Sequence, residues 1–410
     1  GCLMGIMLGL DGIENGPDWR GPIADRLLIS SADGGNSIND AVRTAYYLAN
    51  MGLQLAGDAP MDAPKDGAQF HFSLPGSQQG FRPLGAAGGS VTVPLRNVEF
   101  EGSRALAIGY EALGPGQVAA ATTPTFSPPE MLNMRTYDLM ATPLIYPGQV
   151  LKARLVAPKG NRGAVEVRLR ARVYDANDEL RDVDGPVQAL QPGAEVTLDW
   201  RLPEFDGQPI AEIGVVVTAA GRRADGAVLL DYMRWDGAAE LSLHRPAGDG
   251  DFWRMAWVNG VDFFSKRFPP SFRISHSSGE GMVSHGTRQW TDYALKSDVM
   301  VHLGNYGGVA LRVQGLRRYY GVRVTRSNRL EIVRVRDGEE TVLATTDFPF
   351  AFELAIPFAA RVVGNTISAE VAGISISATD SSALGFANGG IGLVVHEGAL
   401  STDVVTITAA

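Results

Sequence analysis

From Gln69 to the end of the chain, apolar and polar residues alternate with a period of two, and this pattern limits the fold most. In Val165–Val173 every second residue is apolar and every residue between is charged. Since successive strand side chains point to opposite faces, this segment is a predicted strand with one face on a core and one in water. The same kind of segment recurs at Ser90–Leu95, Ala105–Tyr110, Val150–Val156, Glu195–Leu198, Glu212–Ala219 and Val228–Trp235.

A second β-rich region follows the sequence PAGDG at 246–250. Tight hairpins are expected at Asp337-Gly338 and Ala372-Gly373, because glycine readily takes a positive φ. Glycine and proline number 49 and 23 of 410 residues, above their usual combined share of about 12%, so turns are abundant. The predicted fold class is mainly β: two β-sandwiches, jelly-roll or concanavalin-like, at 62–245 and 250–410. The strands expected in the second region are Tyr293–Val301, Val309–Val313, Tyr319–Thr325, Leu330–Val335, Phe352–Val363, Thr366–Val371, Ile374–Ala378, Gly390–Val395 and Val404–Thr408.

Residues 1–57 follow a helical pattern instead. Gly1, Gly5 and Gly9 recur every four residues among Leu, Ile and Met, which predicts a helix that is apolar all round and therefore buried. Apolar residues at helical spacing between Ile38 and Leu53 predict a second helix. So short a segment cannot enclose these helices, and we interpret it as the all-α remnant of a larger domain.

This segment resembles the C-terminal end of the ADP-ribosylglycohydrolase family, which includes the dinitrogenase-reductase-activating glycohydrolases. The similar stretches are GCLMGIMLGLDGI at 1–13, Trp19, PIADRLL at 22–28 and NSINDAVRT at 36–44. The resemblance implies Mg²⁺-assisted hydrolysis of a glycosidic bond in an ADP-ribosyl or related substrate. It also implies that the metal-binding Asp-Thr-Asp motif would precede Gly1. We therefore expect a fragment that is inactive alone, has no catalytic or metal residues of its own, and packs against the rest of its catalytic domain.

The two β-rich regions resemble known sandwich families more loosely. AVLLDYMRWDG at 227–237 is similar to the closing strand of galactose-binding-like modules. The run at 290–324 and the ending at 389–408 are similar to concanavalin A-like lectin/glucanase domains. These resemblances imply accessory carbohydrate-binding domains of a multidomain bacterial hydrolase, although fold likeness alone does not establish a ligand.

Charge and composition exclude several other classes. The chain has 36 Lys+Arg and 45 Asp+Glu, for a net charge of −9, which argues against a nucleic-acid partner. A single cysteine, Cys2, rules out an internal disulfide and a cysteine-based zinc site. The apolar run Gly1–Leu10 is half the length of about 20 residues that a membrane helix needs, so no membrane partner is expected.

Aromatic and charged residues in the second β region are the best candidates for sugar contacts. Of the neighbours Tyr319 and Tyr320, one should face the core while the other lies beside Arg317, Arg318 or Arg323 on the open face. By the same alternation, one of Phe263 and Phe264 should be exposed. The candidate ligand-binding residues are Trp253, Trp257, Trp290, Tyr319, Tyr320 and Arg318.

Other chemistry is less well supported. Asp175, Asn177 and Asp178 could bind Ca²⁺, but an Asp/Asn-rich hairpin turn is the preferred interpretation. No Glu-x-Asp-x-x-Glu string marks a glucanase site, and SHSSGEGMVSH at 275–285 is interpreted as a surface loop rather than part of a hydrolytic triad. Two alternatives to carbohydrate binding stay open: sandwiches with a purely structural or oligomerising role, and a glycoside hydrolase site in the last sandwich.

Overall fold

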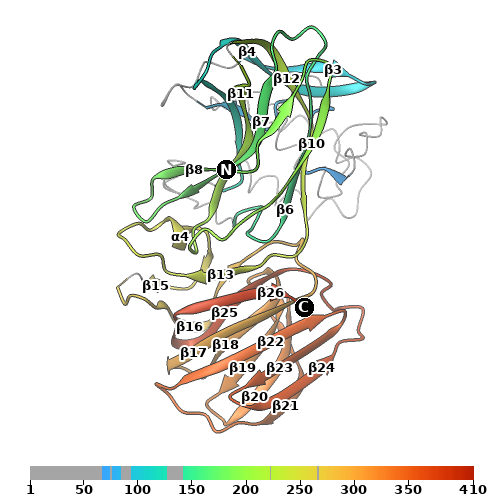
Figure 1. The fold of residues 1–410 in the computed structure, drawn as a ribbon. Helices are drawn as coiled ribbons and strands as arrows, with labels where there is room; N and C mark the ends of the chain where they lie inside the picture. The colour runs from blue at the N-terminus through green and yellow to red at the C-terminus, as the bar shows by residue number, and fades with distance from the viewer. Residues whose placement is uncertain (1–66, 74–75, 85–93, 127–141, 222, 266) are drawn as a thin grey trace, which may run out of the picture.

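The computed structural model describes residues 67–73, 76–84, 94–126, 142–221, 223–265 and 267–410. These residues form antiparallel strands and one short helix, α4 (Phe252–Met255), arranged as two β bodies stacked end to end (Figure 1). The mainly-β prediction is confirmed, whereas the predicted helices at 1–57 lie outside the described residues. Within the described part, no helix is both long and apolar enough to cross a bilayer.

The first body consists of two six-stranded sheets. One has the order β10 (Glu195–Arg201), β6 (Val150–Val156), β12 (Ala224–Asp236), β4 (Ser103–Leu113) and β3 (Leu95–Phe100), with β1 (Phe70–His71) also paired to β12. The other has the order β2 (Arg82–Pro83), β5 (Val118–Pro124), β11 (Ile210–Ala219), β7 (Val165–Tyr174) and β8 (Leu180–Asp184), with β9 (Gln188–Leu190) also paired to β7.

Strand β7 shows why this sequence builds a sandwich. Its apolar residues, such as Val167 and Leu169, are buried in the core between the two sheets. Its arginines lie on the other face, where Arg168 and Arg170 bind Asp184 of β8. The predicted division into a core face and a polar face is therefore confirmed.

The second body is a single 14-stranded sheet that folds over on itself. Its main order is β21 (Glu339–Asp347), β20 (Arg329–Arg336), β19 (Arg318–Thr325), β18 (Tyr306–Gly315), β25 (Gly390–Thr402), β17 (Tyr293–Leu303), β22 (Ala355–Val363), β23 (Thr366–Val371) and β24 (Ile374–Thr379). The remaining strands are β13 (Leu241–His244), β14 (Val258–Gly260), β15 (Phe263–Ser265), β16 (Phe272–His285) and β26 (Val404–Ala409).

Folding over gives this body two layers around one core. Side chains of β18 and β25, such as Val309 and Leu393, join those of β17 and β22, such as Leu295 and Phe358, in one buried cluster. The end strands β21 and β24 also touch, so the sheet nearly closes into a flattened barrel (Figure 1). One side of each layer is therefore left as an outer face.

The turns predicted from sequence form as expected, but one predicted loop is wrong. Asp337 and Gly338 have φ of 55° and 91°, and Ala372 and Gly373 have φ of 48° and 83°, as tight hairpins require. Residues 275–285, by contrast, belong to β16, which pairs with β25 and has a bulge in that pairing between His276 and Glu280. Cross-strand pairing overrides the loop-like composition of this segment.

The two bodies share a packed joint. Tyr146, Leu241 and Leu243 lie in the core cluster of the second body, although all three precede the predicted boundary at 246–250. Strand β13 accordingly pairs with β26. The Asp178 carboxylate of the first body accepts hydrogen bonds from the backbone N–H groups of Asp251 and Phe252, at 2.7 and 2.9 Å.

Candidate functional site

Four of the predicted ligand-binding aromatics are core residues. Trp253, Trp257, Trp290 and Tyr320 are all at least 95% buried. Trp253 stacks on Phe272 with 5.1 Å between ring centroids, and the Tyr320 hydroxyl donates to Asp380 at 2.9 Å. Rings at this depth hold the sandwich together and have no open face for a sugar, which corrects the sequence-based expectation of a stacking surface.

The predicted alternation of adjacent aromatics is confirmed, but Tyr319 is only 1% exposed, so the prediction that it lies on an open face is wrong. Tyr319 points away from Tyr320, into a separate cluster on the outer side of the sheet. Phe263 is 70% exposed and Phe264 only 5%. Arg318 is exposed and binds Asp337 at 2.6 Å. Among the six predicted residues, Tyr319 shares a buried cluster with Met282 and Val335, which line a hollow of the surface, although Tyr319 is not itself part of that lining.

The candidate Ca²⁺ residues form the turn between β7 and β8. The Asp175 carboxylate accepts the backbone N–H groups of Asn177 and Glu179 at 2.8 and 3.0 Å, and these bonds lower its pKa. The Asp178 carboxylate is engaged at the joint between the bodies. In the described parts of the chain, no three His, Cys, Asp or Glu side chains gather as a metal site would require.

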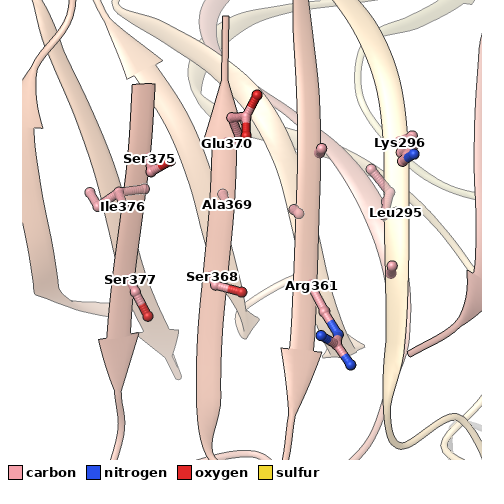
Figure 2. Close-up of a pocket in the computed structure, with 12 residues that line it drawn as sticks. Leu295, Lys296, Arg361, Ser368, Ala369, Glu370, Ser375, Ile376 and Ser377 are labelled. Carbon is pink, nitrogen blue, oxygen red and sulfur yellow. The ribbon is translucent and has the colours of Figure 1, made fainter. Parts of the chain in front are cut away.

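One of two hollows on the second body is a shallow groove of about 560 Å³ over β17, β22, β23 and β24. We call it the serine groove, after Ser368, Ser375 and Ser377 in its lining. Figure 2 shows Ser368 and Ser377 beside Arg361, with other charged side chains farther along the strands. Its lining has no aromatic ring and consists largely of small side chains, and most of its surface is apolar.

The other hollow, of about 510 Å³, lies on the opposite layer and combines apolar and polar surfaces. We call it the Glu280 hollow. It is lined by Gly260, Glu280, Met282, Tyr306, Leu316, Arg317, Val335, Gly338, Glu340 and His396. Met282 and Val335 belong to a buried apolar cluster that also contains Tyr319, so this part of the lining is apolar. The remaining lining is charged or hydrogen-bonding.

Strand register brings the polar residues of the hollow into rows. Glu280 of β16 lies opposite His396 of β25, which lies opposite Tyr306 of β18. In the neighbouring row, Gly308 lies opposite Arg323. Because Gly308 has no side chain, the Arg323 guanidinium has room to cover the Tyr306 ring, 4.1 Å from its centroid.

Arg323 is the buried cation of this surface. It donates to Glu331 at 2.9 and 3.0 Å and to both carboxylate oxygens of Glu340 at 2.6 and 2.7 Å. Burial alone would lower the pKa of Arg323, but Glu340 and Glu331 outweigh it and raise the pKa. Arg323 is therefore a buried positive charge whose hydrogen bonds hold the carboxylates of Glu331 and Glu340 in place.

Glu280 is approached by two phenols. The Tyr306 hydroxyl donates to Glu280 Oε2 at 2.7 Å. The Tyr319 hydroxyl is buried and lies close to Glu280, but it makes no well-formed hydrogen bond within the described residues. Burial first, and the Glu280 charge second, raise the pKa of both phenols, so both stay protonated at neutral pH.

His396 adds a further polar group. Asn305 Nδ2 donates to His396 Nδ1 at 3.0 Å, which places the hydrogen of the neutral ring on Nε2. The imidazole also lies 4.9 Å from the Tyr306 ring, centroid to centroid. The hollow therefore presents a carboxylate acceptor and several donors beside an apolar surface.

Sequence reasoning missed most of this site. It named Tyr319 with Arg317, Arg318 or Arg323 beside it, but it did not propose Glu280, Tyr306 or His396 as site residues. These last three lie on strands that pair out of chain order, β16 with β25 and β25 with β18. The available signal was the period-two pattern itself, since charged residues that alternate with core residues must share one outer face.

No protein-family model matches the chain, and no curated protein matches it. Among solved structures, it is similar to a carbohydrate-binding module, CBM66, from Bacillus subtilis: 17% identity, 37% of this chain, 95% of that chain and a TM-score of 0.34. It is similar to a CBM22 tandem of Xyn10C from Paenibacillus barcinonensis: 10% identity, 83% and 96% coverage and a TM-score of 0.29. A third is the galectin LEC-6 of Caenorhabditis elegans: 13% identity, 36% and 94% coverage and a TM-score of 0.24. At these identities and scores, the likeness concerns β-sandwich architecture and extends no further.

Proposed function

We propose that the chain is a carbohydrate-binding protein whose sugar site is the Glu280 hollow. The observation that carries the proposal is the Tyr319 hydroxyl, which is buried close to Glu280 but makes no well-formed hydrogen bond to it. Buried polar groups are almost always hydrogen-bonded, and an unpaired one costs about 1–3 kcal/mol. A ligand hydroxyl bound between Tyr319 and Glu280 would supply the missing partner.

The shape and chemistry of the hollow suit a sugar ring. A sugar presents C–H groups on its faces and hydroxyls around its edge. Met282 and Val335 offer apolar contact, while Glu280 and His396 offer an acceptor and a donor. A volume of about 510 Å³ also lies within the range of about 300–1,000 Å³ that is usual for small-molecule pockets.

Glycoside hydrolysis in this hollow has weaker support. Such enzymes need two carboxyl groups that can act as acid and as base or nucleophile. Both oxygens of Glu340 are held by Arg323, so this carboxylate is poorly placed to donate a proton. The hydrolase activity and Mg²⁺ that residues 1–57 imply by resemblance stay predictions about an ADP-ribosylglycohydrolase-like domain, whose remnant lies outside the described residues.

The test is binding of the full chain to a glycan array, followed by titration of each hit with two matched variants. Glu280→Ala removes the acceptor at the centre of the hollow and should weaken binding at least tenfold. Glu370→Ala makes the same change in the serine groove and should leave binding unaltered. Silence across the array, or loss of binding only in Glu370→Ala, would contradict the proposal.

A further inference from the structure

Resting on the proposed function, we infer that the Glu280 hollow selects its sugars by charge. It takes a residue that directs hydroxyl or ammonium groups toward Glu280 and rejects one that directs a carboxylate or sulfate there. The ligand class is therefore an uncharged or amino-substituted glycan rather than a uronate or sulfated one.

The fixed charges of the hollow favour this selection. The carboxylates of Glu331 and Glu340 bind the buried cation Arg323, and a third carboxylate, that of Glu280, lines the hollow together with Glu340. All four hydrogen bonds that Arg323 makes to side chains go to Glu331 and Glu340. An incoming anion would have to displace one of these carboxylates to reach the guanidinium. The buried arginine, which is the usual recognition group for anions, is therefore unavailable here.

Glu280 is the carboxylate left for a ligand. It accepts one side-chain hydrogen bond, at Oε2 from Tyr306, while a carboxylate can accept about four. Its remaining acceptor capacity suits donors such as a sugar hydroxyl or an ammonium group. A second carboxylate or a sulfate at the same position would have no proton to share and would be repelled by Glu280.

Arg317 is the group at the hollow that could favour an acidic sugar. Its side chain lines the hollow and is exposed, so it could meet an anionic substituent at the entrance. An exposed guanidinium is screened by water and salt, however, and single surface pairs contribute little to binding. Its contribution can be separated from that of Glu280 by experiment.

The experiment measures dissociation constants of the full chain for sugars that share a backbone but differ in charge. One set is cello-oligosaccharides, their C6-carboxylated derivatives and chitosan oligosaccharides. The same three charge classes are compared on any other backbone that the array selects. At low salt the acidic member should bind at least tenfold more weakly than the uncharged member, and the amino member should bind at least as well.

Two variants identify the residue responsible. Glu280→Gln keeps an acceptor for Tyr306 but removes the charge, so it should shrink the tenfold difference to about threefold or less. Arg317→Gln should leave the order of the three classes unchanged. Acidic sugars that bind as tightly as neutral ones, or whose binding depends on Arg317, would overturn the inference while leaving carbohydrate binding intact. An array without any hit would instead overturn the proposed function and this inference together.

Discussion

Two outer faces of this molecule carry arginines held by carboxylates, and only one of them is a candidate site. On β7 of the first body, Arg170 and Arg172 are bound by Asp182 and by further acidic neighbours. Next to the Glu280 hollow, Arg323 is bound in a similar way, but the nearby Tyr319 hydroxyl is buried close to Glu280 without a well-formed hydrogen bond. The difference teaches that an ion-pair network alone indicates stability, whereas an unsatisfied buried group next to a hollow indicates a ligand.

The largest effect expected from this comparison is loss of stability in the first body. Glu212 is buried and accepts hydrogen bonds from Thr122, at 2.7 Å, and from Arg82 and Arg172. Burial would raise the pKa of Glu212, but these partners together lower it. Glu212→Ala should cost about 2–3 kcal/mol of unfolding free energy, less than a fully buried pair because Arg82 is largely exposed.

Chemical denaturation measures this cost, with Asp199→Ala as the control. Asp199 pairs with Lys152 at 3.7 Å on an exposed surface, so its removal should cost at most about 0.5 kcal/mol. Sugar affinity should not change in either variant. If Glu212→Ala abolished binding while the protein stayed folded, the assignment of the first network to stability would fail.

Part of this architecture was predictable because it depends on local pattern. The alternation of Val150–Val156 gave the bounds of β6 as the structure has them. The Asp337-Gly338 pair gave the hairpin between β20 and β21, because its φ values depend on those two residues. Alternation also placed Tyr319 and Tyr320 on opposite sides of the sheet.

The candidate site was less predictable because it depends on which strands pair. Glu280, Tyr306 and His396 meet only because β25, near the end of the chain, lies between β16 and β18. Burial of Trp253 and Trp257 likewise follows from the packing of α4 against β16, which composition does not reveal. Local sequence pattern therefore predicts where strands lie and which side chains share a face, but it does not predict which strands pair with one another.

A smaller effect concerns the joint between the two regions. His285 is buried there, and burial lowers its pKa from 6.5 to about 3. In the unfolded chain this histidine takes up a proton below about pH 6.5, so acidification favours unfolding. Between pH 6.5 and pH 5 the protein should lose about 1.5 kcal/mol through this residue alone.

Denaturation at the two pH values, with His285→Gln as the reference, isolates this contribution. Glutamine can still donate to the Ala256 carbonyl that His285 Nδ1 contacts at 3.0 Å, but it does not titrate. The variant should therefore lose about 1.5 kcal/mol less than the parent over this interval. An equal loss in both proteins would show that His285 is not kept neutral by burial.

The adjacent tyrosines of β19 allow the closest comparison, since Tyr320 faces the core and Tyr319 packs in the outer cluster that includes two lining residues of the hollow. The Tyr320 hydroxyl donates to Asp380 and accepts from the Phe386 N–H, both at 2.9 Å. Tyr320→Phe should thus cost about 1 kcal/mol of stability and leave sugar affinity unchanged. Tyr319→Phe removes a buried hydroxyl that makes no well-formed hydrogen bond in the protein, so it should stabilise the ligand-free chain by about 1 kcal/mol.

The most direct test of the account is the sugar affinity of Tyr319→Phe, measured by calorimetry on a ligand that the parent chain binds. Loss of the ligand hydrogen bond should weaken binding about fivefold, while the unfolding free energy of the ligand-free variant should not fall below that of the parent. Unchanged affinity, or a loss of affinity that Tyr320→Phe reproduces, would contradict the claim that the Glu280 hollow is the sugar site.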